Sequence, residues 1–272
     1  MPAASPEKER LAAQYAAKKA AYGWKSPVPD IIDLSRIQTA LDIAAGTCIW
    51  SLDLAATLHA KNLHDVQIYA CDINTGFLPA DTDVTKSFAE GYHGMFDLVH
   101  ISLLVVCLTE DGWKAALANV QKLLKPGGLL MLDEFDLVLF RNGQYSRPVI
   151  GFALQNKFVI GLSFRLREML EEAGLTVEKV QAQRGSVGKT CRIHKGADGG
   201  SPAAFEGSTA EVFESIVARF AAIMLEKGTA EAPSGHHIVN EEELEGILAE
   251  VHEGLKTEGA YIPGACYVAR KS

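Results

Sequence analysis

Two aspartates in the first third of the chain stand where a carboxylate can bind a small molecule. Asp42 lies in the run LDIAAGTCIW (41–50), in which an apolar strand is followed by a turn of small residues, and Asp72 ends the apolar run YACD. The small size of Ala44 and Gly46 lets the backbone approach a ligand closely. A carboxylate after the second strand of a doubly wound sheet can accept hydrogen bonds from both hydroxyls of a ribose. Each feature alone is also typical of an ordinary turn.

Further candidates follow along the chain. At Asp83 and Val84, a carboxylate beside a backbone amide can recognise the amino group and ring nitrogens of adenine. His100 lies near the end of the apolar run FDLVHISLLVV, and an imidazole can act as a general base near neutral pH. Packing and contact with a cofactor are alternative roles for this side chain. Weaker candidates lie in predicted turns and loops, namely His93, His194, His236 and His237.

The elements that must position these residues alternate between strand and helix. Strands are predicted at 39–45, 66–73, 83–84, 96–106, 128–135, 175–183 and 260–270, and helices at 5–21, 50–60, 109–124, 163–173, 209–227 and from Asn240, with a loop at 184–207. This order predicts an α/β protein with a doubly wound, mostly parallel sheet and helices on both faces. Ligands of such sheets bind at the carboxyl ends of the strands.

Composition limits the classes of function. Of 272 residues, 48% are hydrophobic and 22% charged, which is typical of a globular protein. The net charge of −8 argues against a nucleic-acid partner and favours a small-molecule substrate. The five cysteines form no C-x-x-C pair, so no metal is expected. Neither a secretory signal nor a long apolar segment is present, so we expect a cytoplasmic protein without a membrane span; the oligomeric state stays open.

From about residue 38 to 134 the chain resembles the class I, seven-stranded S-adenosylmethionine-dependent methyltransferases, most of all their fungal secondary-metabolism branch. The matching stretches are LDIAAGTCIW, YACDIN, DVTKSF, YHGMFDLVHISLL and LLKPGGLLMLDE. ERLAAQY near the start and AYIPGACYVARKS at the end are also similar, whereas 184–237 is poorly covered. The resemblance implies a seven-stranded sheet with a helical lid in a single domain, 1–272. Its parts would be an N-terminal helical cap (1–37), a cofactor-binding half (38–134) and substrate-facing helices with the final strands (135–272).

The resemblance also implies roles for particular residues. They are Asp42, Ala44, Gly46 and Thr47 around the methionine part of S-adenosyl-L-methionine, Asp72 at the ribose with Ile73 beside it, Asp83 and Val84 at the adenine, and His100 and Ile101 near the sulfonium. His100 is the candidate catalytic base.

One departure concerns the turn after the first strand. The family has three alternating glycines there, and this chain has Ala44, Gly46 and Cys48. The bulk of Cys48, where the helix meets the turn, favours weaker cofactor binding or an altered ligand.

The expected activity is methyl transfer to an oxygen or nitrogen of a small, apolar or aromatic metabolite. Aromatic side chains between residues 135 and 165 are candidates for an apolar substrate wall, and a helical lid or a dimer contact would use the same residues. The alternative is a protein that keeps the fold and the cofactor but catalyses a non-methylating step such as a cyclisation, or that acts as a regulatory binding protein. A nicotinamide-binding domain is disfavoured because the G-x-G-x-x-G fingerprint is absent.

Overall fold

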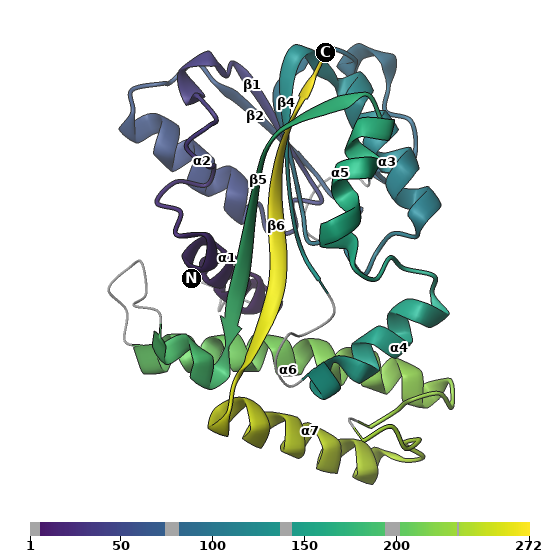
Figure 1. Cartoon of the computed structure of the whole chain (residues 1–272). Coiled ribbons are helices and arrows are strands. Elements are labelled where there is room, and N and C mark those ends of the chain that lie inside the picture. Colours follow the sequence, from purple (N-terminus) through teal and green to yellow (C-terminus); the bar gives the residue numbers. More distant parts are fainter. Residues whose placement is uncertain (1–5, 74–81, 137–142, 194–201, 233) are drawn as a thin grey trace. The chain divides into compact units, whose positions relative to one another are not determined.

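A computed structural model describes residues 6–73, 82–136, 143–193, 202–232 and 234–272 (Figure 1). The chain divides into two compact units. The sheet unit contains 24–134, 162–182 and 265–272, and the helical unit contains 1–23, 135–161 and 183–264. The expectation of a single domain stays a prediction.

One six-stranded sheet runs through the described residues in the order β2-β1-β3-β4-β6-β5. Its strands are β1 (Thr39–Ile43), β2 (Gln67–Cys71), β3 (Phe96–Ser102), β4 (Leu124–Phe135), β5 (Leu175–Val187) and β6 (Ala260–Lys271). The pairs β1–β2, β1–β3 and β3–β4 are parallel, while the arrows of β5 and β6 point in opposite directions (Figure 1). The prediction of a mostly parallel α/β sheet is therefore confirmed.

Three helices flank this sheet in the sheet unit. They are α2 (Ile49–Ala60), α3 (Glu110–Leu123) and α5 (Leu162–Glu172), with α2 on one side of the strands and α3 and α5 on the other (Figure 1). Thr109 caps α3 as expected, because its Oγ1 accepts a hydrogen bond from the Gly112 amide at 3.2 Å. The inward stripe of α3 is fully buried at Trp113, Leu117 and Val120. The helices thus cover both faces and leave the strand ends to form a site.

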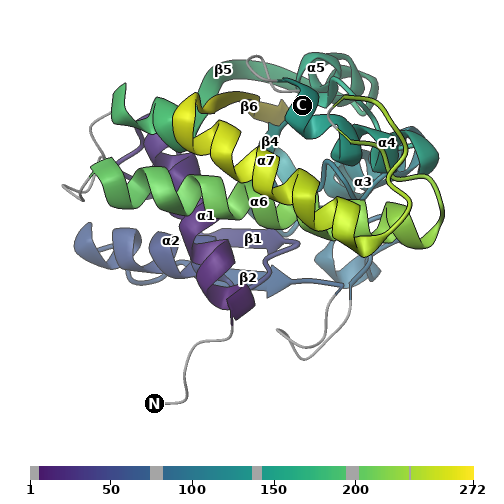
Figure 2. The ribbon, with the colours of Figure 1, turned by 90° about the horizontal axis from the view of Figure 1, so that it is seen from below.

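The helical unit contains α1 (Pro6–Tyr22), α4 (Arg147–Gln155), α6 (Pro202–Glu226) and α7 (Glu241–Thr257). Figure 2 shows α6 and α7 side by side, with α1 crossing α6. The predicted start of α7 is confirmed, because Asn240 Oδ1 accepts from the Glu243 amide at 2.9 Å and Glu243 Oε2 accepts from the Val239 amide at 2.9 Å. None of the described helices is both long and apolar enough to cross a membrane.

Two sequence predictions are corrected. The short strand expected at 83–84 is a turn, because Asp83 Oδ1 accepts hydrogen bonds from the Thr85 amide and hydroxyl at 2.9 and 2.7 Å and so competes with strand pairing. The described sheet consequently has six strands instead of seven. The predicted loop 184–207 contains the end of β5, the 3-10 helix η4 (Gly188–Ile193) and the first turns of α6. The helical lid stays a prediction.

Candidate functional site

The turn after β1 carries three left-handed residues at alternating positions. Ala44, Gly46 and Cys48 have φ angles of 57°, 52° and 59°. Glycine enters this region freely, whereas other residues do so at a cost of roughly 1–2 kcal/mol. Cys48 is also the N-cap residue of α2, and its side chain makes no capping hydrogen bond. The backbone is therefore left-handed at all three positions where the resemblance implies glycine, and two of these positions carry other side chains.

Asp72 joins this turn to the end of the neighbouring strand. Its Oδ2 accepts a hydrogen bond from the Gly46 amide at 2.8 Å, and the Ala45 amide donates to the Cys71 carbonyl at 3.0 Å. Because β1 and β2 are parallel neighbours, their carboxyl ends lie at the same edge of the sheet. The structure thus brings Asp72 and Gly46 together, and it buries Asp72 to 8% exposure.

The turn around Val84 lies next to Asp72. The Thr82 amide donates to the Asp72 carbonyl at 2.8 Å. From α3, Asn119 Nδ2 donates to the carbonyls of Val84 and Lys86 at 2.9 and 2.8 Å. This buried amide fixes the turn at the edge of the sheet where β2 ends.

The other predicted cofactor residues occupy different environments. Hydrogen bonds from the Thr85 side chain and amide lower the pKa of Asp83, so this carboxyl is ionised at neutral pH. Ile73 is 67% exposed, Thr47 is half-buried and Ile101 is fully buried. Since side chains alternate along a strand, Ile101 points to the face of β3 opposite its neighbour His100.

His100 is enclosed on three sides. Its Nδ1 lies 2.8 Å from Asp42 Oδ1, and its Nε2 lies 3.4 Å from Asp133 Oδ2. The ring stacks on Trp50 with centroids 4.1 Å apart and planes 7° from parallel. Ser51 donates to the other oxygen of Asp42 at 2.7 Å. His100 is 3% exposed, and this burial does not favour a catalytic role. That role stays a prediction.

Three of the side chains at this edge were not singled out from the sequence: Trp50, Asp133 and Glu134. Glu134 accepts hydrogen bonds from the amides of Leu104 and Val105 at 2.7 and 3.2 Å and thereby holds the segment that follows β3. The available signal was the acidic pair ending the apolar run LLMLDE, which repeats the pattern of an acid at a strand end. Trp50 had no signal beyond its place at the start of α2.

Two cysteines adjoin the carboxylates. Burial, together with the charges of Asp42 and Asp72, raises the pKa of Cys71 to about 12 and raises the pKa of Cys48. Both side chains are therefore protonated thiols at neutral pH, and neither is a nucleophile.

The weaker histidine candidates lie elsewhere. His93 and His237 are exposed, and exposed His236 pairs its Nδ1 with Ser234 Oγ at 2.7 Å. His194 lies outside the described residues. In the part of the chain that the structure describes, no three His, Cys, Asp or Glu side chains are grouped so that they could hold a metal ion.

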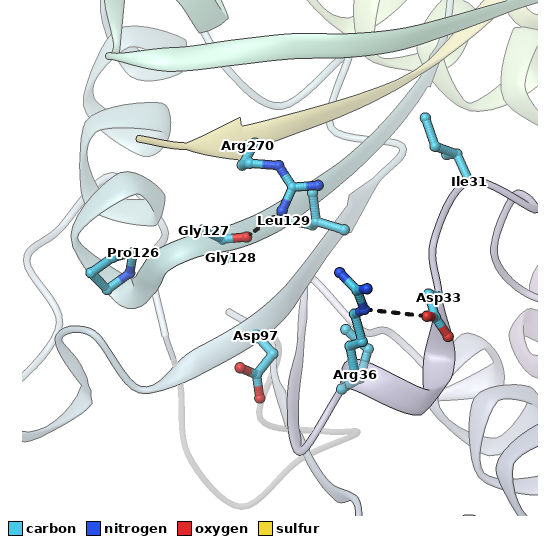
Figure 3. Close-up of a pocket in the computed structure, with 10 residues that line it drawn as sticks. Ile31, Asp33, Arg36, Asp97, Pro126, Gly127, Gly128, Leu129 and Arg270 are labelled. Atoms are coloured by element: carbon cyan, nitrogen blue, oxygen red, sulfur yellow. Dashed lines mark hydrogen bonds and ion pairs between the residues drawn. The ribbon is translucent and has the colours of Figure 1, made fainter.

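A cavity of about 270 Å³ lies at the opposite, amino-terminal edge of β1, β3 and β4 (Figure 3). Its lining residues are Ile31, Asp33, Arg36, Ile37, Asp97, Pro126, Gly127, Gly128, Leu129 and Arg270. Arg36 pairs with Asp33 at 3.4 Å and Arg270 donates to the Gly127 carbonyl at 2.7 Å (Figure 3). These guanidinium groups already have partners within the chain. We therefore place the candidate site at the carboxyl edge, where parallel sheets bind ligands.

The known proteins that match this chain in sequence are methyltransferases. No family model matches the chain. The methyltransferase grgD of a Penicillium species is 33% identical over 117 aligned residues, covering 39% of this chain and 41% of that protein. A demethylmenaquinone methyltransferase of Corynebacterium glutamicum is 30% identical over 119 aligned residues, covering 41% of this chain and 48% of that enzyme. The matches thus span less than half of these relatives, and they confirm the resemblance to methyltransferases, one of them fungal.

The solved structures that match the chain are more distant in sequence. Phosphoethanolamine N-methyltransferase 2 of Haemonchus contortus, in complex with S-adenosyl-L-methionine, is 13% identical over 97% of this chain and 52% of that chain, with a TM-score of 0.46. A SAM-dependent methyltransferase of Methanosarcina mazei is 12% identical over 86% of this chain and 92% of that chain, with a TM-score of 0.48. The cyclase SpnF is 14% identical over 99% of this chain and 83% of that chain, with a TM-score of 0.43.

Proposed function

We propose that this chain binds S-adenosyl-L-methionine at the carboxyl edge of β1 and β2 and transfers its methyl group to an oxygen or nitrogen of a small, apolar or aromatic metabolite. The contact between the Gly46 amide and Asp72 carries the proposal, because it joins the left-handed turn to the acidic end of the next strand. The methyltransferases among the curated relatives support the same activity.

The residues at this edge fit the chemical groups of the cofactor. The amides of Ala45, Gly46 and Cys48 donate within the turn and its neighbouring strand end, to the Cys71 carbonyl, Asp72 and the Ala45 carbonyl. The amides at the start of α2, which the Cys48 side chain does not cap, suit an anionic carboxylate such as that of methionine. The carboxylates of Asp72 and Asp83 are acceptors for the ribose hydroxyls and the adenine amino group.

The protein's task in such a reaction is to bind, to orient and to exclude water. S-adenosyl-L-methionine supplies an activated methyl group when bound. The turn and Asp72 would fix its orientation, which matters because in-line attack requires close alignment of the reacting atoms. Buried His100 is not assigned to proton removal from the acceptor, since both of its ring nitrogens face carboxylates.

The class of acceptor is inferred from aromatic side chains. In the helical unit, Phe152 stacks on Phe220 with ring centroids 4.3 Å apart and also contacts Phe158. Aromatic surface of this kind favours ring-bearing, apolar ligands.

Calorimetric titration with S-adenosyl-L-methionine and, separately, with NAD tests the binding step. We expect saturable binding of S-adenosyl-L-methionine alone. Failure of S-adenosyl-L-methionine to bind would overturn the proposal. The reaction itself is tested by incubating the loaded protein with a panel of aromatic alcohols and amines and measuring product mass. A gain of one methyl group supports transfer, whereas an isomer of the substrate would support the non-methylating alternative.

A further inference from the structure

His100 lies in line between two carboxylates from the neighbouring strands. It is the direct cross-strand partner of Asp42 in β1, and Asp133 lies on its other side in β4. The Nδ1–Oδ1 distance to Asp42 is 2.8 Å and the Nε2–Oδ2 distance to Asp133 is 3.4 Å. The three side chains are 4%, 2% and 1% exposed.

The number of protons on the ring follows from this arrangement. A neutral imidazole has one N–H and one lone pair. One of its two nitrogens would then direct a lone pair at a buried carboxylate, and that carboxylate would lose a donor that burial makes valuable. An imidazolium donates from both nitrogens and is attracted to both carboxylates, with charge-assisted hydrogen bonds.

A second, independent contact favours the cationic ring. Trp50 of α2 stacks on His100 with centroids 4.1 Å apart and planes 7° from parallel. A cation within about 6 Å of an indole face is stabilised by the ring quadrupole, more strongly when water is excluded. Trp50 is itself held in place, because its Nε1 donates to the Pro27 carbonyl at 2.9 Å.

The bridge continues to the proposed cofactor turn through Asp42. While Oδ1 of Asp42 faces His100, its Oδ2 accepts from Ser51 Oγ at 2.7 Å. Asp42 is in β1 and Ser51 is in α2, so one carboxylate ties together the two elements that flank the turn at Ala44 to Cys48. On the far side, Ser102 donates to Asp133 at 3.1 Å.

We propose that His100 is held as an imidazolium between Asp42 and Asp133, and that it is a positioning residue for the cofactor turn instead of the base that deprotonates the acceptor. The inference that His100 positions the cofactor turn rests on the proposed function. The inference that its ring is an imidazolium does not. Among the described residues, the titratable groups that contact the ring are Asp42 from β1 and Asp133 from β4, while α2 presents the uncharged Trp50.

Nuclear magnetic resonance of protein labelled with ¹⁵N-histidine tests the state of the ring without a variant that perturbs folding. The two ring nitrogens of an imidazolium resonate close together, whereas those of a neutral tautomer resonate far apart. At about pH 8, above the ordinary histidine range near 6.5, we expect one imidazolium signal. It should disappear in His100→Gln and persist in His93→Gln, which alters an exposed histidine. A neutral tautomer at His100 would overturn the proposal.

The dissociation constant of S-adenosyl-L-methionine as a function of pH tests positioning. Between about pH 6 and 10, binding by the unaltered protein should weaken as the ring loses its second proton, while His100→Gln should bind at least about 10-fold more weakly at pH 6 and show a flatter profile. Ser51→Ala is a milder variant that loosens Asp42 but keeps the His100 bridge, and it should weaken binding while retaining the imidazolium signal.

Matched pH profiles in the unaltered protein and His100→Gln, at equal affinity, would overturn the positioning role. If the unaltered protein did not bind S-adenosyl-L-methionine at any pH, the proposed function would fail, and the resonance experiment would still decide the state of the ring.

Discussion

The backbone amide of Gly46 donates to the carboxylate of Asp72 at 2.8 Å, joining the turn after β1 to the end of β2. This hydrogen bond gives Asp72 a structural task in addition to the ligand-binding one proposed for it. The two tasks can be separated, because an amide oxygen can replace a carboxylate oxygen as the acceptor for Gly46 but does not carry its charge.

The first prediction uses that difference. Asp72→Asn should weaken S-adenosyl-L-methionine binding by about 10- to 150-fold, since charge-assisted hydrogen bonds contribute roughly 1.5–3 kcal/mol. The free energy of unfolding should change by less than about 1 kcal/mol, because Asn can still accept from the Gly46 amide. Calorimetric titration and urea unfolding measure the two quantities.

Asp65→Asn is the matched control for Asp72→Asn. Asp65 is an exposed aspartate shortly before β2, so its substitution removes the same charge from the same loop-strand segment without touching the turn. The affinity of Asp65→Asn for S-adenosyl-L-methionine should equal that of the unaltered protein. If Asp72→Asn bound equally well, Asp72 would be a turn-forming residue only.

The second prediction concerns the left-handed Cys48. Replacing it by glycine should raise the free energy of unfolding by about 0.5–1 kcal/mol, because relief of the left-handed strain outweighs the extra entropy of glycine in the unfolded chain. S-adenosyl-L-methionine should bind as tightly or more tightly. Ala55→Gly, at an exposed helical position in α2, should instead lower stability by about 1 kcal/mol. If both variants lowered the free energy of unfolding, Cys48 would make a favourable contact that outweighs its strain.

Much of the fold follows from the sequence because local signals and burial agree there. Asn240 and Thr109 cap helices as predicted, and the apolar runs of β1, β3 and β4 form buried neighbouring strands. The strand expected at Asp83 failed because a side chain that bonds to the local backbone outcompetes strand pairing, and this competition leaves no mark in hydropathy.

The candidate site was predictable only in part. Acidic residues at strand ends located Asp42 and Asp72, because parallel strands bring their carboxyl ends to one edge. The partners of His100 were missed, since a contact across three strands depends on register, which sequence spacing does not give. The stack of Trp50 on His100 likewise depends on the rotation of α2 against the sheet.

The third prediction concerns thiol reactivity. With its pKa raised to about 12, Cys71 is a thiolate in roughly one molecule in 3 × 10³ at about pH 8.5. Iodoacetamide should therefore modify exposed Cys107 and leave Cys71 unmodified, as peptide mass mapping would show. Removal of the nearby charge in Asp72→Asn should speed labelling of Cys71. The folded protein also keeps the Cys71 proton to higher pH than the unfolded chain does. The free energy of unfolding should therefore fall progressively as pH rises above about 9. Equal labelling of both thiols in the folded protein would contradict the assigned environment.

The fourth prediction concerns the segment after β3. Leu103 is left-handed at φ 62°, and Glu134 holds the next two amides with its two carboxylate oxygens. In Glu134→Gln one of those amides would face an NH₂ group, so a hydrogen bond to a charged group is lost and a buried donor is left unpaired. The free energy of unfolding should fall by about 2–4 kcal/mol in urea unfolding.

Glu243→Gln is the control for Glu134→Gln, because exposed Glu243 accepts from the Val239 amide through one oxygen, which glutamine retains. Its stability should change by less than about 0.5 kcal/mol. Leu103→Gly should raise the free energy of unfolding of the otherwise unaltered protein, in which Glu134 holds the left-handed segment, and should raise it less in the Glu134→Gln background, where the segment can relax. Equal effects in the two backgrounds would mean that Glu134 stabilises β4 itself and does not constrain the segment beside the proposed cofactor site.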